Sequence, residues 1–257
     1  MVRAIRPPKP DPREPRFKVP PNACDTHFHI YGPEDKFPYK ASMFERHYTP
    51  TDQCTLEHYQ ALQKITGFER GVIVTGNPNG RYNNDVTLDA IARSNGRIKG
   101  IAPIDCLIDQ TALERLAAGG IVGYRIQRHS MGSEFFFDAE RTAARVRDLR
   151  WHVEVHVDSL AESMELIDWL PKLRIPYVLD RLAGVPSHPR LDDPLFQKVL
   201  NHLRDSQECW VSLYGFYRLS AEGAPLYSDL IPIVAALVEA RPDRIIWGSN
   251  WPHAITD

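Results

Sequence analysis

The fold is decided by the stretch from residue 120 to residue 158. It reads GIVGYRI at residues 120–126 and WHVEVHVD at residues 151–158, with a helical pattern over Ala139–Arg150 between them. Short segments rich in β-branched residues and bounded by turn residues predict strands, and the longer pattern predicts a helix. Two strands joined through a helix predict a parallel pair with a crossover connection.

The same strand–helix unit recurs from residue 23 to the end of the sequence. The predicted strands are Ala23–Ile30, Gly71–Thr75, Ile98–Ile104, Gly120–Ile126, Trp151–Val157, Ile175–Leu179, Cys209–Leu213 and Arg244–Gly248. The predicted helices are Thr55–Ile65, Asn84–Arg93, Gln110–Ala118, Ala139–Arg150, Ala161–Leu170, Pro194–Arg204 and Leu226–Ala240. This alternation implies a parallel sheet, so we expect an α/β fold of the (β/α)8 TIM-barrel type. An open doubly wound sheet is less favoured, because no glycine-rich nucleotide motif follows any predicted strand.

The two ends of the sequence depart from this pattern. Residues 1–21 contain seven prolines and almost no periodic apolar residues. Proline lacks a backbone N–H, so we expect this segment to be an extended arm, and residues 22–257 to form the barrel domain. The sequence ends soon after the eighth predicted strand, so we expect the last helix of the barrel to be missing from this sequence.

Composition limits the classes of partner. The 257 residues are 43% apolar and 25% charged, with a formal net charge of -2, as in ordinary globular proteins. With no basic surplus we expect no nucleic-acid partner, and with no apolar run near the roughly 20 residues of a membrane span we expect no membrane partner. Four scattered cysteines and the lack of an apolar signal core favour a cytoplasmic protein. A homo-oligomer is left open.

Histidines stand at the ends of two predicted strands. Side chains alternate along a strand, and barrel enzymes carry their active sites at the carboxyl ends of the strands. His27 and His29 therefore point to the same side at the end of the first strand, and His156 and Asp158 end the polar face of the fifth. We interpret the three histidines as catalytic candidates. Because three histidines and a water form a catalytic zinc site, one zinc on His27, His29 and His156 is an alternative to a site without cofactor.

Arginines also gather at predicted strand ends. They are Arg125, Arg128, Arg181 and Arg218. The guanidinium fork matches the geometry of a carboxylate, so the set predicts an anionic small-molecule substrate. Their positive charge also opposes a bound divalent cation, which favours a site without metal.

Several motifs together resemble a known family. They are Cys24–His29, Tyr31–Pro33, Phe37–Tyr39, Arg46–Pro50, Gly123–Arg125, Gly215–Ser220 and Trp247–His253, in the family's order. The chain from about residue 22 onward resembles the amidohydrolase-related proteins akin to 2-pyrone-4,6-dicarboxylate hydrolase. The resemblance implies a (β/α)8 barrel of the amidohydrolase superfamily that acts on carboxylated lactones. It also implies that the histidines, the arginines and Tyr48 surround the substrate, and it allows catalysis without metal.

Two positions differ from the family pattern. Arg181 follows Asp180 where the family usually has histidine, and Asn250 stands where it usually has aspartate. An amide cannot accept a proton at neutral pH, so the general base for lactone hydrolysis is expected to be His27, His29 or His156, whose ordinary pKa suits neutral pH. Asn250 would orient the water or the substrate, and Tyr48 would donate a hydrogen bond.

Two further functions remain open. The family includes sugar-acid lactone isomerases, in which a hydroxyl of the substrate attacks the ring carbonyl in place of water. That reaction needs a proton shuttle but no strong base for water, which suits Asn250. The other alternative is a non-catalytic binding protein on an enzyme-like barrel, and turnover of any carboxylated lactone would argue against it.

Overall fold

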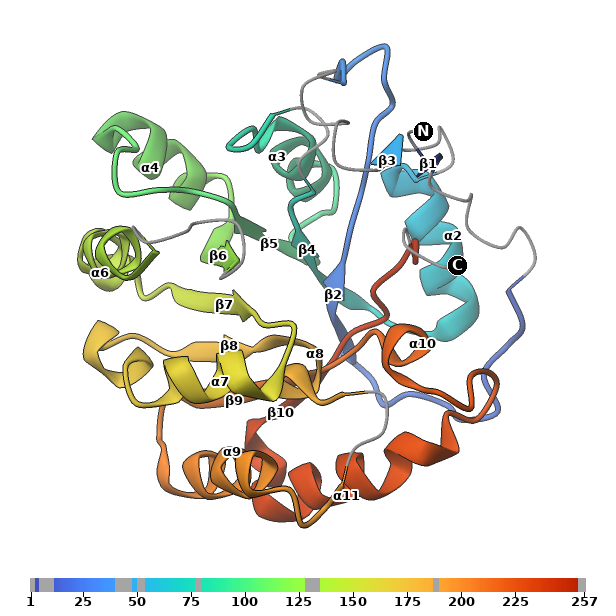
Figure 1. The fold of residues 1–257 in the computed structure, drawn as a ribbon. Coiled ribbons are helices and arrows are strands. Elements are labelled where there is room, and N and C mark those ends of the chain that lie inside the picture. The colour runs from blue at the N-terminus through green and yellow to red at the C-terminus, as the bar shows by residue number, and fades with distance from the viewer. Residues whose placement is uncertain are drawn as a thin grey trace. The chain divides into compact units, whose positions relative to one another are not determined.

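We describe a computed structural model of the chain (Figure 1). It describes residues 3–4, 12–39, 48–49, 54–76, 80–127, 135–186 and 190–253. Arg128, one of the predicted site residues, lies outside these ranges, and so does the side chain of Tyr48.

Eight parallel strands form one sheet. They are β2 (Cys24–Phe28), β4 (Arg70–Val74), β5 (Ile98–Ala102), β6 (Ile121–Gln127), β7 (His152–His156), β8 (Tyr177–Leu179), β9 (Cys209–Leu213) and β10 (Ile245–Trp247). Their order in the sheet is their order in the chain. A parallel sheet in sequential order with alternating helices is the (β/α)8 TIM-barrel fold, so the predicted fold class is confirmed.

Helices connect these strands. The longer ones are α2 (Leu56–Thr66), α3 (Asp85–Ala92), α4 (Gln110–Ala118), α6 (Phe135–Val146), α7 (Leu160–Ile167), α9 (Pro194–Asp205) and α11 (Ile231–Ala240). Two short elements, α8 (Asp180–Gly184) and α10 (Phe216–Leu219), follow β8 and β9 and were not predicted. The proline-rich arm contributes β1 (Arg3–Ala4), which pairs with β3 (Tyr48–Thr49) outside the main sheet.

Local capping explains where three helices begin. The side chain of Asp109 accepts a hydrogen bond from the backbone of Ala112 at the start of α4, and Ser159 does the same for Glu162 at the start of α7. Asp193 caps α9, whose first residue is Pro194. These residues satisfy backbone N–H groups that have no partner within the helix, so the starts of these helices follow from the sequence.

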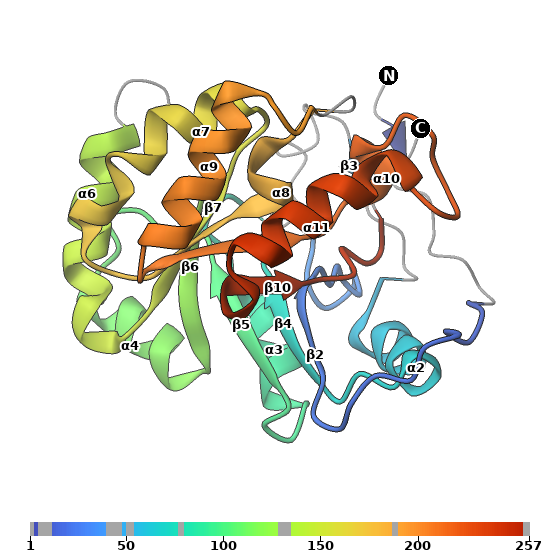
Figure 2. The ribbon, with the colours of Figure 1, turned by 90° about the horizontal axis from the view of Figure 1, so that it is seen from below.

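The chain forms two compact units. Unit 1 comprises residues 1–103, 109–121 and 249–257, and unit 2 comprises residues 104–108 and 122–248. Unit 1 contains β2, β4 and β5, where Gly71 pairs with Ile98. In unit 2, α7 and α9 pack side by side, as Figures 1 and 2 both show.

Strand β7 has the two faces that its sequence predicts. Val153, Val155 and Val157 are fully buried and belong to the apolar core. Glu154 on the opposite face is also buried, and it lies beside Arg125 of β6 in the register of the two strands. Because polar groups inside a protein need partners, this face marks a buried polar cluster.

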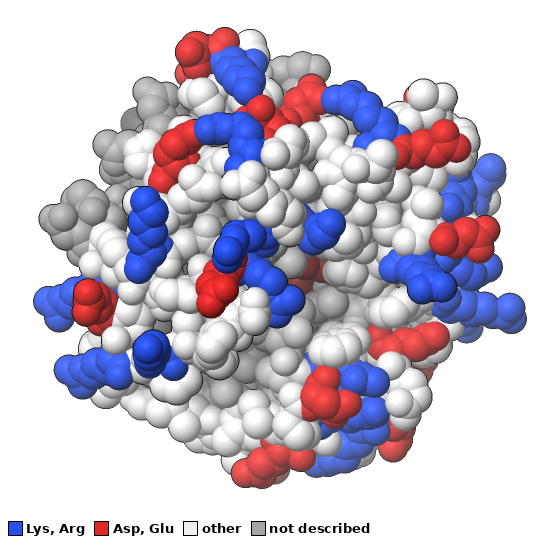
Figure 3. Space-filling model, turned by 180° about the vertical axis from the view of Figure 1, so that it is seen from behind, with Lys and Arg blue, Asp and Glu red and all other residues white. Residues whose placement is uncertain are grey.

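No helix among the described residues is long and apolar enough to cross a membrane. On the face in Figure 3, basic and acidic side chains are interspersed, as the near-zero net charge leads one to expect.

Candidate active site

Unit 1 brings His27 and His29 together at the end of β2. Their ring centroids lie 5.1 Å apart and the ring planes are nearly perpendicular. His27 is buried, and His29 is half-buried. The alternation of side chains along β2 thus places both imidazoles on one side, as the sequence predicts.

Asn250 lies against His29. The Nδ1 atom of His29 is 2.8 Å from the carbonyl oxygen of Val74, and its Nε2 atom is 3.2 Å from Oδ1 of Asn250. A carbonyl only accepts, so Nδ1 carries a hydrogen and Nε2 holds the lone pair of the neutral ring. An amide can turn either its oxygen or its N–H group toward a ring nitrogen. Asn250 can therefore accept a hydrogen bond from Nε2 of a protonated His29 or donate one to Nε2 of a neutral His29.

The backbone of Asn250 is held on both sides. Its N–H donates to the carbonyl of His27 at 2.8 Å, and the N–H of His29 donates to the carbonyl of Trp251 at 2.8 Å. Asn250 has a φ of 54° in the left-handed region. Asparagine tolerates this conformation better than most residues, which suits it to this turn.

Asp25 was missed in the sequence analysis. This buried carboxylate accepts hydrogen bonds from the backbone N–H of Ser249 at 2.9 Å, from the Ser249 hydroxyl at 2.6 Å and from Tyr59 at 3.0 Å. Burial raises its pKa, and these hydrogen bonds oppose the rise. Asp25 therefore attaches the segment before Asn250 to β2. The two-residue spacing of Asp25 from His27 could have indicated that both side chains lie on the same side of the sheet.

Unit 2 contains a buried cluster around Arg125. The Nη2 atom of Arg125 lies 2.9 Å from Asp180, 2.9 Å from Nδ1 of His156 and 3.1 Å from the hydroxyl of Tyr214. The Asp180 side chain is 0% exposed. Burial raises the pKa of Asp180, and the charge of Arg125 opposes that rise. Asp180 and Tyr214 reach the cluster from the ends of β8 and β9, and the sequence analysis did not identify either as a partner of Arg125.

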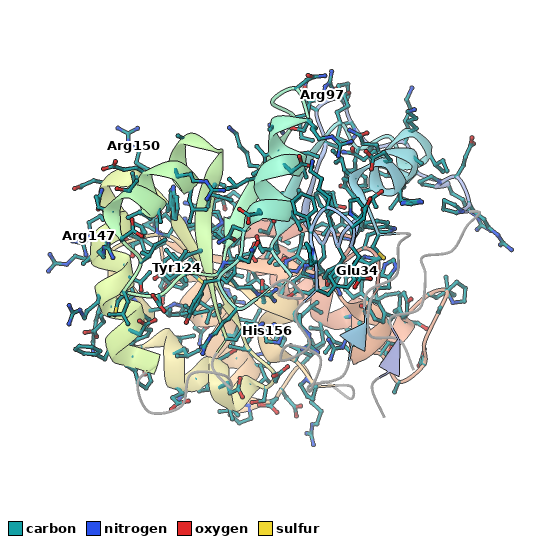
Figure 4. The ribbon with its side chains drawn as sticks, turned by 90° about the horizontal axis from the view of Figure 1, so that it is seen from above. Glu34, Arg97, Tyr124, Arg147, Arg150 and His156 are labelled. Atoms are coloured by element: carbon teal, nitrogen blue, oxygen red, sulfur yellow. The ribbon has the colours of Figure 1, made fainter. Side chains whose placement is uncertain are left out.

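His156 is the last residue of β7 (Figure 4), and its two ring nitrogens lie near two different arginines. Its Nδ1 atom faces Arg125, and its Nε2 atom lies 3.4 Å from Nη1 of Arg181 and 3.3 Å from Asp158. Burial, together with the charges of both arginines, lowers the pKa of His156 to about 3. His156 is therefore neutral and weakly basic at neutral pH.

Arg181 projects from an unusual turn directly after β8. Arg181, Leu182 and Ala183 have φ angles of 51°, 55° and 55°. Its Nη1 atom donates to Oδ1 of Asp158 at 2.7 Å. The left-handed conformation is disfavoured for residues with a Cβ atom, so the surroundings must hold this turn in place.

The arginine that follows β9 lies apart from this cluster. Arg218 belongs to α10 and is exposed. Within the described part of the chain its side chain makes no hydrogen bond or ion pair.

The predicted zinc alternative can be examined at the ring nitrogens of the histidines. His156 has a guanidinium within hydrogen-bond distance of Nδ1 and another 3.4 Å from Nε2, and positive charge there opposes a cation. The Nδ1 atom of His29 donates to the Val74 carbonyl, and its Nε2 atom is next to Asn250. The surroundings of His156 therefore disfavour zinc at that residue, whereas the Nε2 lone pair of His29 is compatible with a metal ligand.

Comparisons with known proteins agree with the predicted family. A curated protein of Hydrogenophaga intermedia named 4-sulfomuconolactone hydrolase is 36% identical over 242 residues, which cover 93% of this chain and 77% of that protein. A protein of Comamonas testosteroni named 2-pyrone-4,6-dicarboxylate hydrolase is 31% identical over 252 residues, covering 95% and 81%. A crystal structure from Acinetobacter baumannii, described as a probable 2-pyrone-4,6-dicarboxylic acid hydrolase with citric acid bound, has a TM-score of 0.77. It is 27% identical and covers 90% of this chain and 85% of that one.

The family assignment rests on nearly the whole chain. A family model described as amidohydrolase matches residues 24–257, which include both histidines of β2, the arginines after the strands and Asn250. The match and the two hydrolase relatives confirm the predicted membership of a hydrolase family. The chain belongs to the amidohydrolase family.

Proposed function

We propose that this protein hydrolyses a lactone ring that carries an anionic group, without a metal. The observation that carries the proposal is the contact of His29 with Asn250 beside His27, which provides a positioned proton acceptor in the absence of the family's usual aspartate. The names of the relatives support a lactone as the substrate. The citric acid bound to the similar crystal structure supports an anionic ligand.

The proposed reaction begins with water attacking the carbonyl carbon of the lactone. Nε2 of His29 takes the proton of the water, and the Asn250 amide orients the water or the ring. The ring C–O bond then breaks, the ring oxygen takes up a proton, and the product is an open-chain acid with a hydroxyl or enol group. His29 is a better base for this step than His156, whose pKa is lowered to about 3.

The proposed role of the arginines is to bind the anionic group. A charge-assisted hydrogen bond from a guanidinium is stronger than one between neutral groups. We therefore expect the enzyme to hydrolyse an anionic muconolactone or pyrone at least about 30-fold faster, in kcat/KM, than its neutral methyl ester, since truncating a buried charged pair costs about 2 kcal/mol or more. Initial rates with matched acid and ester substrates measure this ratio. Equal kcat/KM values for acid and ester would remove the anion-binding part of the proposal.

The metal-free part of the proposal has its own test. We expect protein dialysed against a strong chelator to keep its full activity, because the ring nitrogens of His156 lie beside two arginines. Elemental analysis of the dialysed sample serves as the control. A loss of activity that zinc restores in one equivalent would contradict this part while leaving lactone hydrolysis intact.

An isomerase is the second candidate, and Asn250 is the observation that favours it. An amide can orient a substrate hydroxyl by hydrogen bonds but cannot take a proton from water. Product analysis separates the two reactions, because hydrolysis adds a molecule of water and opens the ring, whereas isomerisation yields a lactone of the same mass.

A further inference from the structure

We propose that Asp158 determines the affinity for anionic substrates by pairing with Arg181 in the free enzyme and leaving it when the anionic group of the substrate binds. The proposal assigns anion recognition to Arg181 and makes Asp158 an internal competitor of the substrate. It rests on the proposed function in one respect, the presence of an anionic group on the substrate.

The position of Arg181 is set by the backbone rather than by Asp158. A buried hydroxyl on α7, that of Ser163, donates to the carbonyl of Ala183 at 2.7 Å. Gly184, with a φ of 75°, lies so close to Ser159 that an added Cβ atom would come within 2.5 Å of the Ser159 backbone. These contacts hold the left-handed turn, so the backbone that carries Arg181 is anchored independently of the ion pair with Asp158.

Asp158 is much more exposed to solvent than Arg181, although its Oδ1 atom also lies 3.3 Å from Nε2 of the neutral His156. The side chain of Asp158 is 44% exposed, whereas that of Arg181 is 9% exposed. A carboxylate that turns away from Arg181 is rehydrated by solvent, so breaking this pair costs little. A substrate anion that reaches Arg181 forms a charge-assisted hydrogen bond with a largely buried guanidinium. This bond replaces the ion pair between Arg181 and Asp158.

The second arginine of the cluster, Arg125, has an acidic partner that is buried rather than exposed. Arg125 pairs with Asp180, which is completely buried. Moving that carboxylate would leave a charge inside the protein without a partner, so Asp180 cannot give way to a substrate. The two ion pairs therefore differ in the exposure of the acidic partner, and only the pair of Arg181 with Asp158 can be exchanged for a ligand.

Binding of citrate to the wild type and to Asp158→Asn tests the proposal independently of turnover. Because an exposed ion pair is worth up to about 1 kcal/mol, we expect Asp158→Asn to bind citrate about two- to five-fold more tightly by calorimetry at constant ionic strength. The KM for an anionic lactone should fall by the same factor with kcat unchanged. Asp168→Asn, which removes one exposed negative charge after α7, serves as the matched control and should change neither value.

A second pair of variants distinguishes two roles of Asp158: competing with the anion for Arg181, or holding Arg181 in position for the anion. In an Arg181→Gln background, Asp158→Asn should give no gain in citrate affinity, because the competition requires the guanidinium. Weaker or unchanged citrate binding by Asp158→Asn, or no binding by either protein, overturns the proposal. If no lactone is hydrolysed but the citrate results hold, the proposed function fails and this inference stands.

Discussion

Replacing Asn250 by aspartate is expected to raise the rate of hydrolytic ring opening by about 100-fold, the lower end of the usual contribution of general-base catalysis. The new carboxylate would lie where the amide oxygen is 3.2 Å from Nε2 of His29. There it can accept a proton from water and can stabilise the protonated imidazole. Initial rates and product ratios with an anionic lactone measure the change.

The same variant should also alter the pH profile. An anionic oxygen next to His29 favours the charged ring, so the rising limb of activity is expected to move to higher pH. Aspartate tolerates the left-handed backbone at position 250 much as asparagine does, so the turn should be kept.

Asn250→Gly is the matched control for this prediction. Glycine also accepts a φ of 54°, so Asn250→Gly removes the side-chain amide without disturbing the turn. A change in activity in this variant is therefore due to the loss of the amide. We expect Asn250→Gly to be less active than the wild type. If Asn250→Gly is fully active and Asn250→Asp changes neither the products nor the pH profile, position 250 takes no part in the reaction.

The second large effect is expected at Arg125, on stability. Arg125→Leu would leave the buried carboxylate of Asp180 without its ion-pair partner. Removing one member of a buried pair typically costs about 3–5 kcal/mol. Urea denaturation at pH 7 should show a loss of this size in the free energy of unfolding.

The double variant Arg125→Leu/Asp180→Asn tests the stated cause. Removing both charges should recover a large part of the loss, and should restore folding if the single variant does not fold. Since burial raises the pKa of Asp180, the penalty of the single variant should also shrink as the pH falls and this carboxyl takes up a proton. A double variant no more stable than Arg125→Leu at any pH would show that Arg125 stabilises the fold by packing alone.

The sequence by itself determined the parts of this protein that depend on local pattern. The strand at residues 151–157 was predicted because apolar and polar residues alternate there, and the buried valines of β7 follow from that alternation. The placement of His27 beside His29 follows for the same reason, because a two-residue spacing on a strand fixes the side of the sheet. The (β/α)8 fold emerged because this local pattern recurs along the chain.

The tertiary structure decided which atoms meet. No sequence spacing reveals that Arg125 contacts Asp180, or that the Nδ1 atom of His156 faces a guanidinium, because these groups come from different strands. The left-handed turn at Arg181 also has no local signal, since only the contacts of Ser163 and Gly184 hold a conformation that these residues otherwise avoid. The sequence therefore determined which residues are available for chemistry. The tertiary structure decided their charge partners, because electrostatic energies depend on distance and burial rather than on separation along the chain.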